Sequence, residues 1–168
     1  LTLARTDNDK HLPAMDENDI GDIDLIVVNL YPFTEVVTEG ADFDTAIENI
    51  DIGGPAMSRG AAKNHEFVTV ITDPQDYNKV LREMDEHDGA TTYGLRRRLA
   101  ANAVAMTATY DSNIAGWFGE QIDEYEFPRR ISFSGNWKQT LRYGENPHQN
   151  GAIYIDASHY RPGVATAK

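Results

Sequence analysis

The chain has 168 residues, 40% hydrophobic and 25% charged, with a formal net charge of −12, proportions typical of one globular domain or of a domain plus a piece of another. The acidic excess argues against a general nucleic-acid surface, because phosphate backbones are held by clustered Lys and Arg. The lack of cysteine excludes a disulfide scaffold and is compatible with a cytoplasmic location, and no apolar run approaches the roughly 20 residues that cross a bilayer.

The first two predicted elements are a surface helix and a buried strand. Residues 8–17 are polar with Leu12 and Met15 on one side, which is typical of a short surface helix. Residues 23–29 form a near-continuous apolar run, which predicts a strand buried on both faces of a parallel sheet. Asn29 would then lie at the carboxyl end of that strand, where ligands bind in open α/β sheets.

Further segments alternate between helix and strand. Residues 43–50 carry apolar side chains at helical spacing, and residues 67–72 predict a second buried strand. Between them a helix is expected around Pro55, and after them Asp73 and Pro74 are typical of the cap and first position of another helix. The order of elements predicts an α/β layered domain with parallel strands. The apolar stripe of the last helix is predicted at Tyr77, Val80, Leu81 and Met84.

The IDIGGP segment places Asp51, Gly53 and Gly54 just before Pro55. Pro is favoured in the first turn of a helix, glycines let the backbone bend and let a ligand approach, and a helix start favours an anion or a carbonyl-type oxygen. Lys63 follows roughly 12 Å beyond Pro55 on the same predicted helix. Together these residues predict a polar ligand site. Each alone also fits a structural role, Asp51 as a helix cap and Lys63 as a charge that complements the helix dipole.

The carboxyl half begins with a long helical region at 91–121, which Asp111-Ser112-Asn113 is expected to break into two helices. The arginines at 96–98 are predicted to be a solvated face rather than a phosphate site, because adjacent helix residues point in different directions. After Pro128 the pattern changes, and a domain boundary is predicted there. Short strand-like pieces follow at 130–133 and 152–155.

Three segments resemble one known family. NLYPF at 29–33, IDIGGP with AAKNH at 50–65, and LRYGENPHQ at 141–149 are similar, in the same order, to the bifunctional purine-synthesis proteins that are AICAR transformylase and IMP cyclohydrolase. LRYGENPHQ is the most specific of the three, because no common structural motif demands that string. RPGVATA at 161–167 is also similar to the stretch that follows in some members.

The resemblance implies a piece of a longer protein. Family members carry a Gly/Ser/Thr-rich phosphate loop and a Lys-Thr-Leu-His-Pro motif, which this sequence lacks before Leu1. Residues 1–128 would be the later part of a cyclohydrolase domain with a methylglyoxal-synthase-like α/β fold and a layered parallel sheet. Residues 129–168 would be a linker and the first strands of a second α/β domain, the transformylase domain.

The resemblance also implies roles for individual residues. The nucleotide in the cyclohydrolase site would be contacted by Asn29, Asp51, Ile52 and Gly53, and ring closure would use Tyr31, Asp51 and Lys63. Arg142 and Tyr143 match the pair that binds the aminoimidazole carboxamide ribonucleotide in the transformylase site. His65 and His148 keep a structural interpretation, since a lone histidine in a loop more often makes structural hydrogen bonds.

The implied reaction closes 5-formamidoimidazole-4-carboxamide ribonucleotide (FAICAR) to inosine monophosphate (IMP) with loss of water. This half would need no metal or cofactor, and 10-formyltetrahydrofolate would be the co-substrate that formylates AICAR in the other half. The expected partners are these purine nucleotides and a second copy in a homodimer, with no nucleic acid and no membrane. The alternative is a noncatalytic nucleotide-binding or assembly module, or a truncated inactive fragment, because the phosphate loop is missing.

Overall fold

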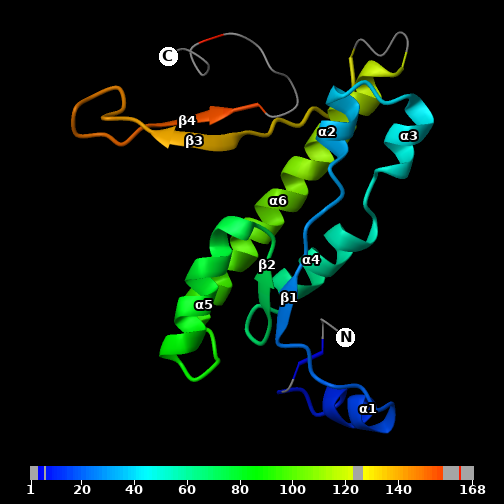
Figure 1. Cartoon of the computed structure of the whole chain (residues 1–168), viewed down its shortest axis with the longest axis vertical. Coiled ribbons are helices and arrows are strands. Elements are labelled where there is room, and N and C mark those ends of the chain that lie inside the picture. Colours follow the sequence, from blue (N-terminus) through cyan, green and yellow to red (C-terminus); the bar gives the residue numbers. More distant parts are fainter. Residues whose placement is uncertain (1–3, 6, 123–126, 157–162, 164–168) are drawn as a thin grey trace. The chain divides into compact units, whose positions relative to one another are not determined.

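The computed structural model describes residues 4–5, 7–122, 127–156 and 163, and these fall into two compact units (Figure 1). The first unit comprises Leu1–Pro32 and Ile47–Thr107, and the second comprises Phe33–Ala46 and Ala108–Lys168. Each unit is described by itself. In the described part of the chain no helix is long and apolar enough to cross a membrane.

The first unit is a mixed α/β structure, as the order of the sequence patterns predicts. Its elements are α1 (His11–Glu17), β1 (Leu25–Val27), α4 (Gly53–Lys63), β2 (Thr69–Ile71), the 3-10 turn η1 (Pro74–Asp76), α5 (Tyr77–Glu86) and the first part of α6 (Tyr93–Glu120). The surface helix expected at 8–17 is therefore confirmed, although it begins at His11.

The strands β1 and β2 lie side by side and are parallel, with Ile26 opposite Val70 (Figure 1). Backbone hydrogen bonds continue the ladder beyond the strands, from the Val28 amide to the Ile71 carbonyl at 2.9 Å and from the Thr69 amide to the Asp24 carbonyl at 2.8 Å. The predicted parallel pairing is confirmed. Their carboxyl ends point the same way, so Asn29 and Thr72 follow the two strands at one edge of the sheet.

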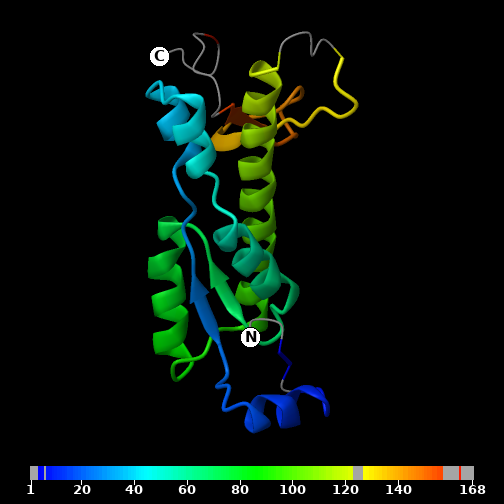
Figure 2. The same ribbon diagram turned by 90° about the vertical axis from the view of Figure 1, so that its right-hand side faces the viewer.

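Strand β2 is covered on both faces, because adjacent strand residues point to opposite sides. Val70 packs with the alanines of α4 and α6, Ala61, Ala62, Ala100 and Ala103. Ile71 packs instead with Val80 of α5 and with Leu95 and Leu99 of α6. Figure 2 accordingly shows α4 and α5 on opposite sides of the strand pair. Small alanines allow α4 and α6 to approach β2 closely.

Strand β1 corrects two expectations. The strand has three residues rather than the seven from 23 to 29, and Leu25 and Val27 are 42% and 51% exposed, so burial on both faces is wrong for this chain. Among its residues only Ile26 packs against a core cluster. The physical reason is that β1 pairs through one edge, with β2, and the helices of this unit gather around β2.

The predicted cap and helix after β2 are largely confirmed. The side chain of Asp73 accepts a hydrogen bond from the Gln75 amide at 2.8 Å and caps η1, which leads directly into α5. Val80 is buried, and Tyr77 and Met84 pack against its cluster. Leu81 was expected in the same stripe but is 58% exposed, because a ten-residue helix covered along one narrow face leaves this position in solvent.

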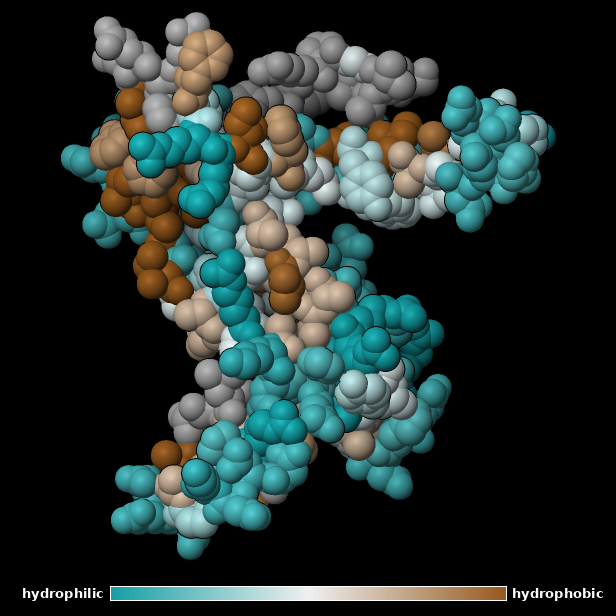
Figure 3. Space-filling view, turned by 180° about the vertical axis from the view of Figure 1, so that it is seen from behind, coloured by the Kyte–Doolittle hydropathy of each residue, from teal (hydrophilic) through white to brown (hydrophobic). Residues whose placement is uncertain are grey.

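The second unit holds α2 (Phe33–Thr38), the start of α3 (Phe43–Glu48), the last part of α6 and an antiparallel hairpin of β3 (Asn136–Thr140) and β4 (Ala152–Ile155). Aromatic side chains of α2, α3 and α6 form a cluster, with Trp117 5.5 Å from Phe33 in an edge-on arrangement and 5.4 Å from Phe43 in a stacked one. Hydrophobic side chains also gather on the surface over α3 (Figure 3), where Phe43 and Phe118 are exposed.

Two sequence expectations in this unit are wrong. Helix α6 runs unbroken through residues 111–113, because the polar side chains there bond to other segments instead of competing for their own backbone. Asn113 donates to the Thr34 hydroxyl at 3.2 Å, and Ser112 donates to the Ser132 hydroxyl at 3.0 Å. Residues 130–133 are not a strand, since the strand that pairs with β4 is 136–140. The strand expected at 152–155 is confirmed, whereas α2 was not predicted.

Candidate functional site

Asn29 follows β1 and is exposed at the carboxyl edge of the strand pair, as predicted. Its amide nitrogen donates to the Thr72 carbonyl at 3.5 Å, and its amide oxygen accepts from the Tyr77 hydroxyl at 3.3 Å. These bonds tie the segment after β1 to the segment after β2. Tyr77 was expected only as a core residue, so its bond to Asn29 was missed, and its hydroxyl was the available signal because a partly buried Tyr usually needs a partner.

Asp51 joins the start of α4 to the NLYPF segment. One carboxylate oxygen accepts from the Gly54 amide at 2.7 Å, and the other accepts from the Tyr31 amide at 3.3 Å. The first bond satisfies an N–H that the first turn of a helix leaves unpaired. Asp51 thus binds the first turn of α4, although the N-cap position expected for it is occupied by Ile52. In addition the carboxylate lies beside the backbone of Tyr31, whose side chain is 56% exposed.

Gly54 is required by close packing. A Cβ at this position would lie 2.5 Å from Leu30 Cδ2 and 2.6 Å from Asp51 Oδ2, so the ends of both side chains would have to shift. Gly53 has no atom within 4 Å of its added Cβ, and the neighbouring Ile52 is 78% exposed. Gly54 therefore lets the helix start approach the end of the NLYPF segment, while Ile52 and Gly53 present an open surface.

Lys63 is the last residue of α4 and is exposed. At about 1.5 Å per residue it lies roughly 15 Å along the helix from Gly53. The structure therefore brings Asp51 next to the backbone of Tyr31 and leaves Lys63 at the other end of α4. A ligand that touches both Asp51 and Lys63 therefore has to extend along α4.

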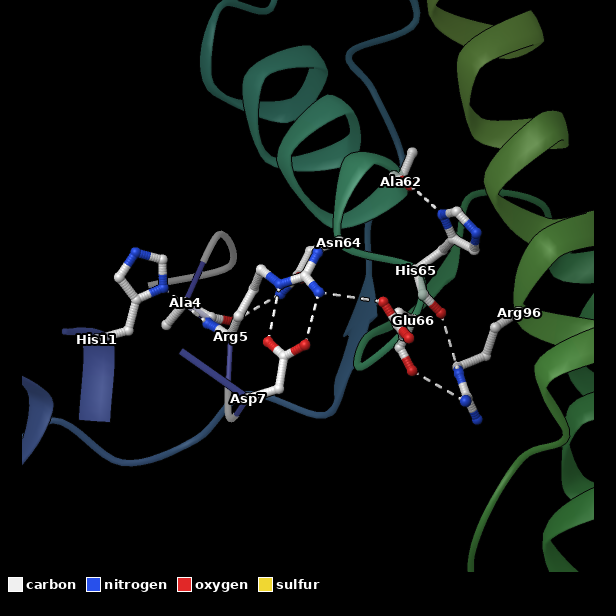
Figure 4. A network of polar contacts seen from close by, with 9 residues as sticks. All are labelled: Ala4, Arg5, Asp7, His11, Ala62, Asn64, His65, Glu66 and Arg96. Carbon is white, nitrogen blue, oxygen red and sulfur yellow. Dashed lines mark hydrogen bonds and ion pairs between the residues drawn. The ribbon is translucent and has the colours of Figure 1, made fainter. Parts of the chain in front are cut away.

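The loop that follows Lys63 is held on two sides (Figure 4). Asn64 is 4% exposed, and its side chain donates to the Ala4 carbonyl at 2.7 Å. From α6, Arg96 donates to the His65 carbonyl at 3.0 Å and to the Glu66 carbonyl at 2.9 Å. A solvated role for Arg96 is therefore wrong, because its guanidinium binds backbone carbonyls.

Arg5 anchors the amino-terminal segment to the same loop. Its guanidinium makes two hydrogen bonds to the Asp7 carboxylate, at 2.9 and 2.7 Å, and one to Glu66 at 3.3 Å. It also lies 5.3 Å from the ring centre of Phe67. The hydrogen bonds and charge of Arg5 hold the pKa of the Asp7 carboxyl below its ordinary value, and that of Arg5 is raised in turn.

The LRYGENPHQ motif forms the connection of the β3–β4 hairpin in the second unit. The connection closes on itself through the Gly144 amide, which donates to the Gln149 carbonyl at 2.6 Å, and the Asn146 amide, which donates to the Gln149 side chain at 3.0 Å. Arg142 and Tyr143 are exposed at its start. The motif thus presents an arginine and a tyrosine side by side in sequence from a braced loop.

The histidines separate into two cases. His65 Nδ1 lies 3.0 Å from the Ala62 carbonyl, and its ring stacks on Tyr93, which fits the structural interpretation. His148 is exposed in the hairpin connection. Across the described ranges, no group of three or more His, Asp or Glu side chains gathers as a metal site.

Comparison with known proteins gives one consistent result. Residues 3–56 match the MGS-like domain, and residues 61–168 match the AICARFT/IMPCHase bienzyme. Over 166 residues the chain is 57% identical to the bifunctional purine biosynthesis protein PurH of Roseobacter denitrificans, and it is also 57% identical to that of Paracoccus denitrificans. Each match covers 99% of this chain but 31% of the relative, so the chain spans about a third of the length of these curated proteins.

A solved structure agrees with the sequence matches. The crystal structure of ForH is similar with a TM-score of 0.61 and 36% sequence identity, over 70% of this chain and 61% of that one. The fold, the sequence motifs and the extent of the matches point to the same conclusion. The chain belongs to the AICARFT/IMPCHase bienzyme family.

Proposed function

We propose that this chain carries part of an IMP cyclohydrolase site, which closes FAICAR to IMP in de novo purine synthesis. The observation that carries the proposal is the placement of Asp51, whose two oxygens accept from the Gly54 and Tyr31 amides at the carboxyl edge of a parallel strand pair. The 57% identity to PurH proteins over almost the whole chain supports it. The match of residues 3–56 to the MGS-like domain supports the finer assignment to a layered, methylglyoxal-synthase-like sheet.

Ring closure requires the site mainly to orient the two reacting groups and to transfer protons. The carboxamide nitrogen attacks the formyl carbon and gives up one proton, the formamido nitrogen gives up a second, and the former formyl oxygen takes both and leaves as water, so a C–N bond forms and the C–O bond breaks. Both groups are on one molecule, so holding them in a near-attack geometry is the main contribution. Asp51 orients or deprotonates the amide, and Tyr31, whose backbone amide binds Asp51, donates to the departing oxygen. Lys63, at the other end of α4, stabilises the negative charge of the reacting nucleotide from there. Asn29, Ile52 and Gly53 provide the surface on which the nucleotide lies.

The second activity, formyl transfer to AICAR, is assigned to the transformylase domain, whose first residues lie in this chain. Arg142 and Tyr143 bind AICAR, and formyl transfer uses 10-formyltetrahydrofolate as co-substrate. In this proposal residues 1–128 belong to the cyclohydrolase domain, residues 129–168 lead into the transformylase domain, and the protein is a homodimer. The braced β3–β4 connection supports this assignment, because it presents both side chains to solvent.

The test is a spectroscopic assay of FAICAR conversion on two proteins. One is the 168-residue chain, and the other, the extended protein, is this chain continued at both ends to the length of its relatives. The extended protein is expected to form IMP well above the uncatalysed rate, and the 168-residue chain, which spans about a third of the length of its relatives, to be much slower. An extended protein that binds IMP but gives no closure above background would identify a noncatalytic nucleotide-binding module instead.

A further inference from the structure

We propose that Asn64 is a positioning residue for Lys63, and that the amino-terminal segment acts on the site through it. This inference rests on the proposed function, in which Lys63 takes part in ring closure. Lys63 itself makes no hydrogen bond or ion pair through its side chain within the residues that the structure describes. The backbone at Lys63 therefore sets where its side chain begins, and so the region that its ammonium group can reach.

That backbone is fixed by Asn64. The Asn64 amide donates to the Gly60 and Ala61 carbonyls at 3.1 and 3.0 Å and closes the last turn of α4. The Asn64 carbonyl accepts from the Phe67 and Val68 amides, both at 3.0 Å, and so starts the turn into β2. One residue thus ends the helix at Lys63 and begins the turn that follows it.

The side chain of Asn64 connects this corner to a distant segment. It is 4% exposed, and its amide nitrogen donates to the Ala4 carbonyl at 2.7 Å, across 60 positions of sequence (Figure 4). A buried amide that loses its partner has to find another or move toward water, because an unpaired polar group is costly in a packed interior. Removing this bond is therefore expected to loosen the corner at Asn64, and the backbone of Lys63 with it.

Arg96 holds the same corner from α6. Its guanidinium binds the His65 and Glu66 carbonyls, the two residues after Asn64, and reaches back to the carbonyl of Thr91. Arg5 completes the amino-terminal side through its bond to Glu66. Bonds from the amino-terminal segment and bonds from α6 thus hold this short turn separately, which is more than the end of a helix needs. The turn directly follows Lys63, the residue to which the mechanism assigns charge stabilisation.

The test uses the extended protein with Asn64→Ala, measured for kcat, for KM and for the thermal unfolding midpoint. A displaced Lys63 is expected to lower kcat about tenfold, since small misplacements at a reacting centre are costly, with KM changed less than about twofold. The matched control is Asn18→Ala, which removes the same kind of bond, from the Asn18 side chain to the Ala14 carbonyl at 2.8 Å, in α1. The control is expected to leave kcat unchanged.

A double mutant separates positioning from general stability. If Asn64 acts through Lys63, adding Asn64→Ala to Lys63→Ala lowers kcat no further, because the group that it places is already gone. A further tenfold loss in the double mutant, or an unchanged kcat in Asn64→Ala, would overturn the proposal. Arg96→Lys, which keeps the charge but cannot bind several carbonyls at once, should repeat the pattern if Asn64→Ala folds poorly. An unmutated extended protein without closure activity would instead remove the proposed function.

Discussion

The carboxylate of Asp51 and the α-carbon of Gly54 are so close that a side chain on Gly54 would force the carboxylate to move. The Gly54 amide donates to one Asp51 oxygen at 2.7 Å, and a Cβ on Gly54 would lie 2.6 Å from the other. The same Cβ would also meet Leu30 at 2.5 Å. The start of α4, the NLYPF segment and the Asp51 carboxylate therefore pack closely together because Gly54 has no side chain.

Gly54→Ala in the extended protein is expected to lower the free energy of unfolding by about 1–3 kcal/mol, as overpacking does, and to lower closure activity because Asp51 must move. Urea unfolding and the FAICAR assay measure the two effects. Gly53→Ala is the matched control, since its Cβ meets nothing within 4 Å. That control should be neutral or more stable by about 0.5–1 kcal/mol, as an added helix former is. Equal destabilisation by both substitutions would contradict the close-packing explanation.

Lys63→Ala in the extended protein is expected to lower kcat roughly 100-fold while IMP affinity changes less than about threefold, because a group that stabilises developing charge acts mainly in the transition state. Stopped-flow or steady-state absorbance gives kcat, and calorimetric titration with IMP gives the affinity. Lys10→Ala removes an exposed lysine from beside α1 and serves as the control. Losses of equal size in turnover and affinity would make Lys63 a binding residue.

Glu83 predicts a specific dependence of stability on pH. Its carboxylate accepts from the Thr92 amide at 2.9 Å, and this backbone hydrogen bond holds the Glu83 pKa below its ordinary value of 4.5. Because the folded-state pKa is lowered, the stabilisation is present above pH 4.5 and is lost as the pH falls through the folded-state value.

The thermal unfolding midpoint of Glu83→Gln should therefore lie below that of the unmodified protein at pH 7, and the difference should shrink as the pH falls below 4.5. Glu86→Gln removes a negative charge from the same helix and is the control for charge alone. A difference that stays constant from pH 7 to acid would show that the Thr92 bond does not depend on the ionised carboxylate.

Arg142→Ala in the extended protein is expected to lower formyl transfer to AICAR at least about tenfold and to leave FAICAR closure unchanged, because Arg142 belongs to the β3–β4 connection and Asp51 to the start of α4. The two reactions are assayed separately, with 10-formyltetrahydrofolate supplied only in the first. Arg130→Ala, an exposed arginine before the hairpin, is the control. A loss of both activities together would indicate a general effect on folding.

The sequence predicted those elements whose residues bind partners a few positions away in the chain or form a continuous apolar stripe. Asp73 caps η1 as expected, and the parallel pairing of β1 with β2 follows from two apolar runs joined through helices. The unbroken course of α6 was not predictable, because the bonds that satisfy Ser112 and Asn113 come from residues about 20 and 80 positions away. Exposure of Leu25 depends on what covers β1, which a periodic pattern does not state.

The candidate site was predictable in composition and less so in geometry. Asp51 was open to two interpretations, and the structure shows its bond to the first turn of α4 while adding the bond to Tyr31. The sequence did not predict the roles of Asn64 and Arg96. An asparagine after a helix and an arginine in a run of basic residues are both common without any long-range contact. Only the long-range bonds to Ala4 and to the Glu66 carbonyl distinguish them.

The two supports of the turn after Lys63 differ in what can weaken them. The Arg5 side relies partly on exposed ion pairs with Asp7 and Glu66, which salt screens and acid neutralises. Arg96 instead binds backbone carbonyls. Carbonyls are not protonated at the pH values that neutralise carboxylates, and they carry no net charge for salt to screen. Salt and acid should therefore weaken the contact between Arg5 and Glu66 first, while the Asn64–Ala4 bond and the bonds from α6 remain. One contact of the turn thus depends on salt and pH, and the others do not.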